Sequence, residues 1–160
     1  MKYVRRLEVD VIICLAFGKR ETEVSLSNKF LIEKIVDLNQ QTPLPLIIQK
    51  DCSDYFPNNI KITKVISDHA ETEKYLDTRE VLRQSINYCK ENSLKKALIF
   101  AHPDHVPRIE NDLKYFNFDY GIAYTKGCPY DSKSTQVWTR NRFFFMFREL
   151  IVRTYYRITY

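Results

Sequence analysis

Several sequence features that would point to a well-known chemistry are missing from this chain. It has no G-x-G-x-x-G fingerprint, no Walker phosphate loop and no nucleophile elbow, and only three of its 160 residues are glycine. Its four cysteines include no C-x-x-C pair, so a structural zinc site is not expected. No apolar run approaches the roughly 18 residues of a membrane-spanning helix. Internal repeats and low-complexity tracts are also missing.

The charge balance has no strong excess of one sign. The 25 lysines and arginines exceed the 20 aspartates and glutamates by five, and the acidic residues are spread throughout the chain. A nucleic-acid-binding protein usually carries a denser basic stripe, so nucleic acid is not an expected partner. Cys14 and Cys89 fall in apolar stretches and are interpreted as small core residues. The scattered cysteines favour a reduced, cytoplasmic protein.

The amino-terminal residues resemble a signal peptide only in part. Basic residues precede the apolar stretch Val9 to Phe17, but Glu8 and Asp10 interrupt it, and no small-residue cleavage pattern follows. We therefore interpret Val9 to Phe17 as a first strand.

The most informative stretch of the chain begins with the short apolar run Leu98 to Ala101. Such a run is typical of a strand that is buried on both faces. Asp104 stands where a helix N-cap belongs, and its carboxylate is expected to accept a bond from the free amides of the first turn. His105 and Arg108 are three residues apart, so they should project from one side of that turn.

Strands and helices are expected to alternate along residues 1–160, which we interpret as a single domain. The expected strands are Val9 to Phe17, Leu46 to Ile48, Lys61 to Ile66, Leu98 to Ala101 and Phe118 to Thr125. The helices should begin near Ser25 or Ser27, at the capping box of Asp77 and Glu80, after Asp104 and at about Thr139, with residues 51–59 in a loop. This alternation predicts an α/β fold, a Rossmann-like three-layer sandwich with a mostly parallel five-stranded sheet. Placing the two most apolar strands at the centre gives the order 3-2-1-4-5.

Candidate site residues gather at the switch point of such a sheet, where the carboxyl ends of the first and fourth strands meet. The candidates for ligand binding are Arg108, Asp104, Gly18, Lys19, Arg20 and Thr78, and those for a catalytic proton carrier are His105 and His102. Arg108 would hold a phosphate or carboxylate with its planar guanidinium. The alternatives are a solvated first turn for His105 and Arg108, with Arg108 paired to a nearby acid, and capping roles for His102 and Thr78. His69 and its acidic neighbours lack the spacing of a metal site, so no metal is expected.

These motifs resemble those of the YdcF/SanA/ElyC family of bacterial proteins, a domain of unknown function (DUF218). The strand followed by His105-Val106-Pro107-Arg108 is similar to the His-x-x-Arg signature of that family. Thr78 to Glu80 and Glu149 are similar to its acidic helix start and its carboxyl-terminal glutamate. The first turn, with its single Gly18, departs from the glycine-rich turn of the family. The resemblance favours a functional role for His105 and Arg108.

The last helix is rich in aromatic residues and arginine. Its apolar stripe, expected to pack on the sheet, consists of Phe143, Phe147, Leu150, Ile151 and Ile158. Phe144 and Phe145 fall away from this stripe, so one of them should face another surface. That surface is either the loop around Val137 and Trp138 or a second copy of the chain in a homodimer. A membrane-surface role for the arginines is the less favoured alternative.

The sequence therefore predicts a cytoplasmic domain that binds a small anionic ligand, nucleotide-like or phosphorylated, at the carboxyl edge of the sheet. The alternatives are a hydrolase or transferase acting on such a ligand, with His102 or His105 as acid or base, and a protein-interaction module that uses the last helix. No cofactor is indicated.

Overall fold

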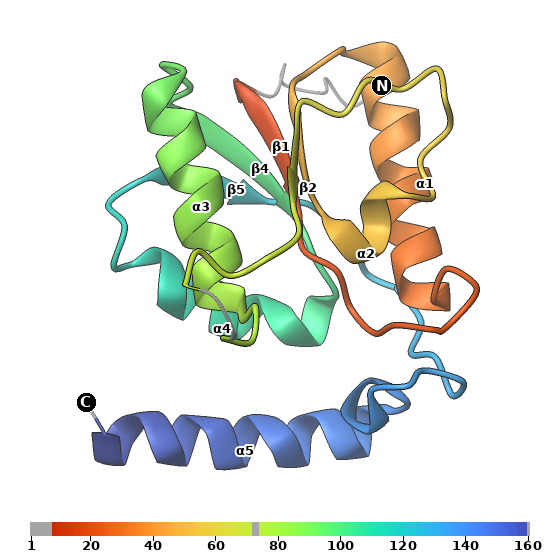
Figure 1. The fold of residues 1–160 in the computed structure, drawn as a ribbon, viewed down its shortest axis with the longest axis vertical. Coiled ribbons are helices and arrows are strands. Elements are labelled where there is room, and N and C mark those ends of the chain that lie inside the picture. Colours follow the sequence, from red (N-terminus) through yellow and green to blue (C-terminus); the bar gives the residue numbers. More distant parts are fainter. Residues whose placement is uncertain (1–7, 72–73, 160) are drawn as a thin grey trace, which may run out of the picture.

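The chain folds around a five-stranded, all-parallel sheet with the strand order β3-β2-β1-β4-β5 (Figure 1). The computed structural model describes residues 8–71 and 74–159, with side chains described as far as Thr154. Its strands are β1 (Val11–Cys14), β2 (Leu46–Gln49), β3 (Lys64–Ile66), β4 (Lys96–Phe100) and β5 (Asp119–Ile122). The predicted α/β class and strand order are confirmed.

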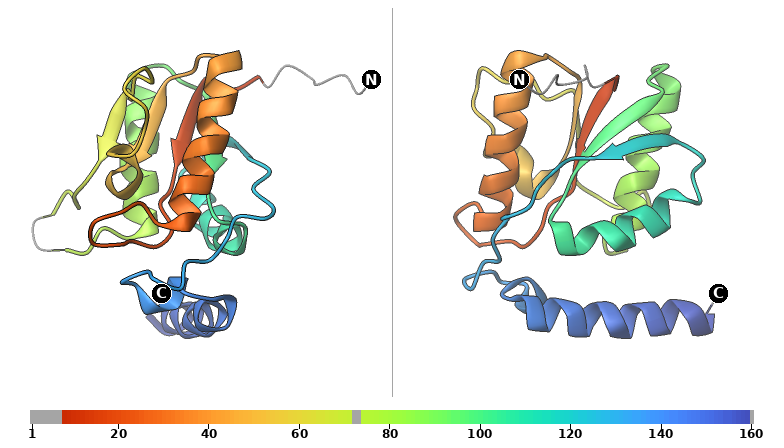
Figure 2. Two further views of the ribbon diagram at one scale, coloured as in Figure 1. Left: turned by 90° about the vertical axis from the view of Figure 1, so that its right-hand side faces the viewer. Right: turned by 180° about the vertical axis from the view of Figure 1, so that it is seen from behind.

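Helices form two outer layers, one on each face of the sheet, and the last helix of the chain lies outside both layers. They are α1 (Leu26–Gln41), α2 (Lys50–Ser53), α3 (Thr78–Glu91), α4 (Val106–Leu113) and α5 (Arg142–Thr159), with short 3-10 turns η1 (Pro103–His105) and η2 (Val137–Thr139). Alternate residues of the central strands point to opposite faces of the sheet: Ile12 and Leu98 pack with α1 and α2, whereas Ile13 and Ile99 pack with α3 and α4. Both faces are therefore covered, as the figure of the molecule from behind also shows (Figure 2).

Local sequence signals place the helix starts well. Ser25 caps α1 by accepting a bond from the amide of Asn28, and Asp77 caps α3 by accepting one from the amide of Glu80. The first, third and fifth strands are shorter than predicted, whereas β2 and β4 are each one residue longer. The helix α2 begins at Lys50 and overlaps the start of residues 51–59, which were expected to form a loop. No helix in the described part of the chain is long and apolar enough to cross a membrane.

The prediction that Asp104 is an N-cap is wrong. The helical turns begin already at Pro103, with η1, and His102 is the N-cap of this turn. Its Nδ1 accepts a hydrogen bond from the amide of Asp104 at 3.3 Å. Asp104 lies inside the turn, so its carboxylate points outward. It accepts a bond from the hydroxyl of Tyr130 at 2.7 Å and pairs with Arg142 at 3.2 Å.

The predicted packing of the last helix is also wrong. Phe143, Phe147, Leu150 and Ile151 are 54–75% exposed, while Phe145 is only 2% exposed. The side chain of Ile158 lies outside the described residues. The physical reason is the position of α5. With both sheet faces already covered, α5 crosses below the carboxyl ends of the strands and can bury only the narrow side that faces them (Figure 1).

Candidate functional site

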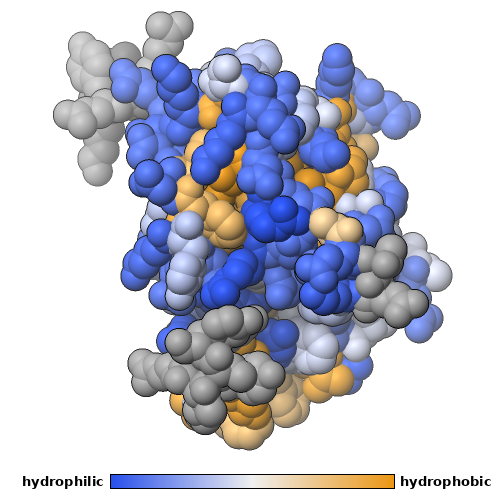
Figure 3. Space-filling model, turned by 60° about the vertical axis from the view of Figure 1, so that its left-hand side comes forward, coloured by the Kyte–Doolittle hydropathy of each residue, from blue (hydrophilic) through white to orange (hydrophobic). Residues whose placement is uncertain are grey.

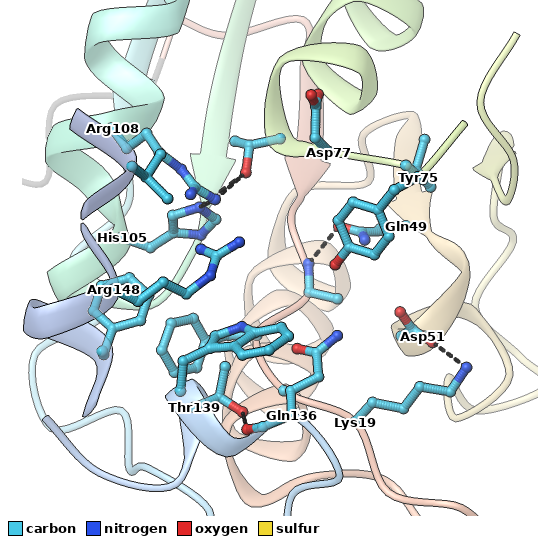
Figure 4. A pocket seen from close by; sticks show the side chains of 18 of the residues that line it. Lys19, Gln49, Asp51, Tyr75, Asp77, His105, Arg108, Gln136, Thr139 and Arg148 are labelled. Carbon is cyan, nitrogen blue, oxygen red and sulfur yellow. Dashed lines mark hydrogen bonds and ion pairs between the residues drawn. The ribbon is translucent and has the colours of Figure 1, made fainter. Parts of the chain in front are cut away.

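A cavity of about 620 Å³ lies between the carboxyl edge of the sheet and α5. This volume is within the range of small-molecule sites. Its wall contains residues that follow β1, β2 and β3, the amino end of α3, the first turn of α4, and η2 with α5. The lining residues include Gly18, Lys19, Gln49, Lys50, Asp51, Tyr75, Asp77, Thr78, Arg79, His105, Arg108, Asp112, Trp138, Phe145 and Arg148. Figure 4 shows His105, Arg108 and Arg148 on one side of the cavity, with Lys19 and Asp51 on the other.

Three of the predicted site residues meet on this wall. The Nη2 of Arg108 donates to Thr78 Oγ1 at 2.6 Å and to His105 Nε2 at 2.9 Å, and Thr78 Oγ1 lies 3.1 Å from the same imidazole nitrogen. Thr78 is the first residue of α3, and the other two belong to consecutive turns after β4. The parallel strands bring these two chain segments to one edge of the sheet.

A buried carboxylate holds Arg108 in place. Glu149 of α5 is 2% exposed, and its Oε1 accepts a bond from Arg108 Nη1 at 3.0 Å. The same oxygen lies 3.6 Å from Arg148 Nη1, whose guanidinium also lies over the ring of Trp138. The guanidinium of Arg108 thus bonds Glu149, Thr78 and His105, which gives it a structural role in addition to the predicted ligand contact.

The contacts of His105 assign its neutral tautomer. A guanidinium can only donate, so Nε2 accepts from Arg108 and the ring proton lies on Nδ1, which is buried without a partner. Burial, followed by the positive charge of Arg108, lowers the pKa of His105 well below its usual value. The ring is therefore neutral at physiological pH and can act as an acceptor or base.

His102 lies behind the cavity wall and does not line it. Its ring stacks on Phe17 at 4.0 Å between centroids, and the residue is 1% exposed. Burial lowers the pKa of His102 to about 4. The ring supports the turn through its bond from Asp104, so its capping role is the one present in the structure.

The first loop contributes Gly18 and Lys19 to the wall. Gly18 has a φ of +77°, and a Cβ atom there would lie 2.9 Å from Thr139 Oγ1, so the close approach of this loop to η2 requires glycine. Ser134 Oγ accepts the amide of Lys19 at 3.1 Å, and Thr135 donates its amide to the carbonyl of Lys19 at 2.7 Å. The side chain of Lys19 reaches Asp51 at 3.4 Å.

Arg20 and Asp104 do not lie on the cavity wall. Arg20 donates Nε and Nη2 to the buried carboxylate of Asp131, at 2.7 and 2.9 Å, and also pairs with Glu23. Its charge is used to hold the first loop against the segment that leads to α5. Asp104 is directed to Tyr130 and Arg142, as described above.

The structure adds residues that sequence reasoning missed. Gln49 is the last residue of β2, Asp51 follows β2 and Tyr75 follows β3, so the rule that places ligands at the carboxyl ends of strands points to them. Trp138, Arg148 and the aromatic Phe145 reach the cavity only because α5 crosses this edge, which no local pattern indicates.

Positive charge predominates on the described part of the wall. Five cationic side chains, Lys19, Lys50, Arg79, Arg108 and Arg148, line the cavity together with three carboxylates, those of Asp51, Asp77 and Asp112. The amino end of α3 adds the positive end of a helix dipole. Among the described residues, no group of three or more His, Cys, Asp or Glu side chains could hold a metal ion. Four of these cations are already paired with a carboxylate: Lys19 with Asp51, Lys50 with Asp54, Arg79 with Asp112 and Arg108 with Glu149. The lining thus has more cationic than acidic side chains, and a bound anion would share these cations with their present partners.

Comparison with protein-family models, with curated proteins and with solved structures found no match to this chain. Its function is therefore inferred from the chemistry of the cavity.

Proposed function

We propose that the cavity binds a small anionic ligand of the nucleotide-like or phosphorylated class. The observation that carries the proposal is the excess of cationic side chains in a cavity of about 620 Å³ at the carboxyl edge of the central strands. The first turn of α3 offers its positive dipole to a phosphate. Trp138 and Tyr75 offer aromatic surfaces for a flat base.

The salt bridge between Lys19 and Asp51 provides a test of the ligand's charge. Binding of nucleotides, sugar phosphates, S-adenosylmethionine and inorganic phosphate is measured by thermal shift and then by calorimetry. For an anionic ligand, Lys19→Gln should weaken binding about tenfold, since it removes one charge-assisted bond. Asp51→Asn should strengthen binding, because it removes a competing negative charge.

Lys126→Gln is the matched control, since Lys126 is an exposed lysine outside the cavity wall and its loss removes the same unit of charge. A panel in which no anion raises the melting temperature contradicts the proposal. So does a ligand whose binding is weakened by Asp51→Asn and unaffected by Lys19→Gln.

A second candidate, a hydrolase or transferase acting on such a ligand, is favoured by the contact between Thr78 and His105. A hydroxyl 3.1 Å from a neutral imidazole is the geometry of a general base with its proton donor. Arg108 donates to the same nitrogen, so proton transfer requires that this bond lengthens. His105→Gln should then abolish turnover of a phosphoester panel while sparing affinity, and turnover that persists unchanged rules out His105 as the base.

We infer a cytoplasmic setting for this function. All four cysteines are free and buried, as is usual for proteins of reducing compartments. The resemblance to the YdcF/SanA/ElyC family stays a prediction that rests on the His105 to Arg108 motif.

A further inference from the structure

The outer side of α5 carries a large exposed apolar surface. It consists of Phe143, Phe144, Met146, Phe147, Leu150 and Ile151, each 42–75% exposed. The helix lies along the edge of the molecule, and no other helix or strand among the described residues covers this side (Figures 1 and 2). In the space-filling view, hydrophobic surface gathers along the same edge (Figure 3).

The apolar residues form a continuous stripe with arginines beside it. At 100° per residue, Leu150, Phe143 and Phe147 fall within about 60° of one another, and Arg142 and Arg153 lie together along one border of the stripe. The 18 residues of α5 span about 27 Å. The helix therefore presents a long, straight apolar face that can lie flat on a plane.

The charge of the helix selects the kind of partner. Its sequence has four arginines and one acidic residue, Glu149, whose carboxylate is buried against Arg108. Arg142 pairs with Asp104 but is 72% exposed, and Arg153 is also exposed. Packing two copies of this face together would bring their arginines close to each other without a carboxylate from the helix between them. An anionic surface instead attracts these arginines.

We propose that the outer face of α5 docks onto the surface of an anionic lipid bilayer. The helix lies in the plane of the interface, with its aromatic and aliphatic side chains at the boundary between headgroups and acyl chains. Arg142 and Arg153 extend along the border of the stripe to the lipid phosphates. Because the inner side of α5 carries Phe145 and Arg148, docking also brings the ligand cavity beside the membrane.

Vesicle co-sedimentation tests this proposal with the whole chain. Vesicles of phosphatidylcholine mixed with phosphatidylglycerol should bind the protein, vesicles of phosphatidylcholine alone should not, and added salt should weaken the binding. The double variant Phe147→Ser with Leu150→Ser should lose more than about tenfold in affinity, because two apolar side chains no longer enter the interface. Arg153→Gln should weaken binding about fivefold.

The matched control is Tyr124→Ser with Tyr55→Ser, which removes two exposed apolar side chains outside α5 and should leave binding unchanged. Circular dichroism checks folding, and Phe143→Ser replaces the double variant if the latter unfolds. Failure to bind anionic vesicles, equal binding to neutral ones, or unchanged binding by a folded stripe variant overturns the proposal. The proposal is also overturned, in favour of a second copy of the chain, if the wild type does not bind vesicles and light scattering finds a dimer for the wild type and a monomer for the stripe variant.

Discussion

The carboxylate of Glu149 connects the polar residues of the cavity wall to the last helix. Arg108 spans the gap between α4 and α5 and bonds Thr78 and His105 on its way. A charge on either partner is tolerated inside the protein only because the other is present. Burial first, and then the positive charge of Arg108 next to its accepting nitrogen, lower the pKa of His105 and keep its ring neutral. The buried ion pair therefore includes Arg108, which is also a candidate ligand-binding residue.

Arg108→Ala should destabilise the protein by about 3 kcal/mol, because it leaves a 2% exposed carboxylate without its closest partner. Urea unfolding measures the change. Arg142→Ala removes a pair in which the arginine is 72% exposed, so it should cost less than about 1 kcal/mol. Replacing both Arg108 and Glu149 by methionine should recover most of the loss. Losses that simply add in the double variant would show that the two side chains do not interact.

The unfolding free energy should fall as the pH is lowered from 6.5 to 4. The pKa of His102 is about 4 in the folded protein, against 6.5 for the ordinary group, so the unfolded chain binds the extra proton in this window. This difference corresponds to about 3 kcal/mol, and His105 acts in the same direction. Urea titrations at several pH values measure the slope.

His102→Gln should flatten this pH dependence, since its amide oxygen can still accept the bond from Asp104. Glu80 affects a lower pH range. Hydrogen bonds from Arg83 lower its pKa to about 2, so the stabilisation of the fold by this carboxylate is lost only as the pH falls below 4.5. A variant with the same slope as the wild type would exclude His102 as the cause.

At the scale of the elements, the two sides of α5 have different surroundings. Its inner side places Phe145 within 5.0 Å of Phe17, between ring centroids, and near the rings of His102, His105 and Tyr130. Its outer side exposes the apolar stripe. The ion pair between Arg20 and Asp131 holds the segment before the helix to the first loop.

Phe145→Ala should cost about 3–5 kcal/mol, because it opens a cavity among buried rings. Phe144→Ala changes the neighbouring residue, which is 42% exposed, and should change the unfolding free energy by less than about 1 kcal/mol. Thermal and urea unfolding compare the two. Similar losses for both variants would mean that α5 rotates about its axis in solution.

At the scale of the whole molecule, the candidate site residues lie at one edge of the sheet. The carboxyl ends of the parallel strands place the loops after β1, β2 and β3, and the turn after β4, beside the amino end of α3. The last helix closes this edge on its inner side and presents its stripe on the outer side. The cavity and the candidate membrane-docking face therefore lie on opposite sides of a single helix.

The sequence by itself determined the features that depend on neighbouring residues. Short apolar runs specified the strands, and the caps Ser25 and Asp77 specified two helix starts, because a strand's burial and a cap's hydrogen bond are local properties. The strand order followed from the greater apolarity of β1 and β4, which identified them as central. The same reasoning brought Thr78, His105 and Arg108 to one edge, since chain segments after parallel strands must meet there.

Only the tertiary structure decided how the last helix is oriented and which charges are already paired. A helical pattern shows that Phe143, Phe147 and Leu150 share a side, but it does not show whether that side meets the protein or the solvent. The partners of Arg20 and Arg108, Asp131 and Glu149, are 111 and 41 residues away along the chain. Such pairs form because packing brings distant segments together, and no local pattern encodes that distance.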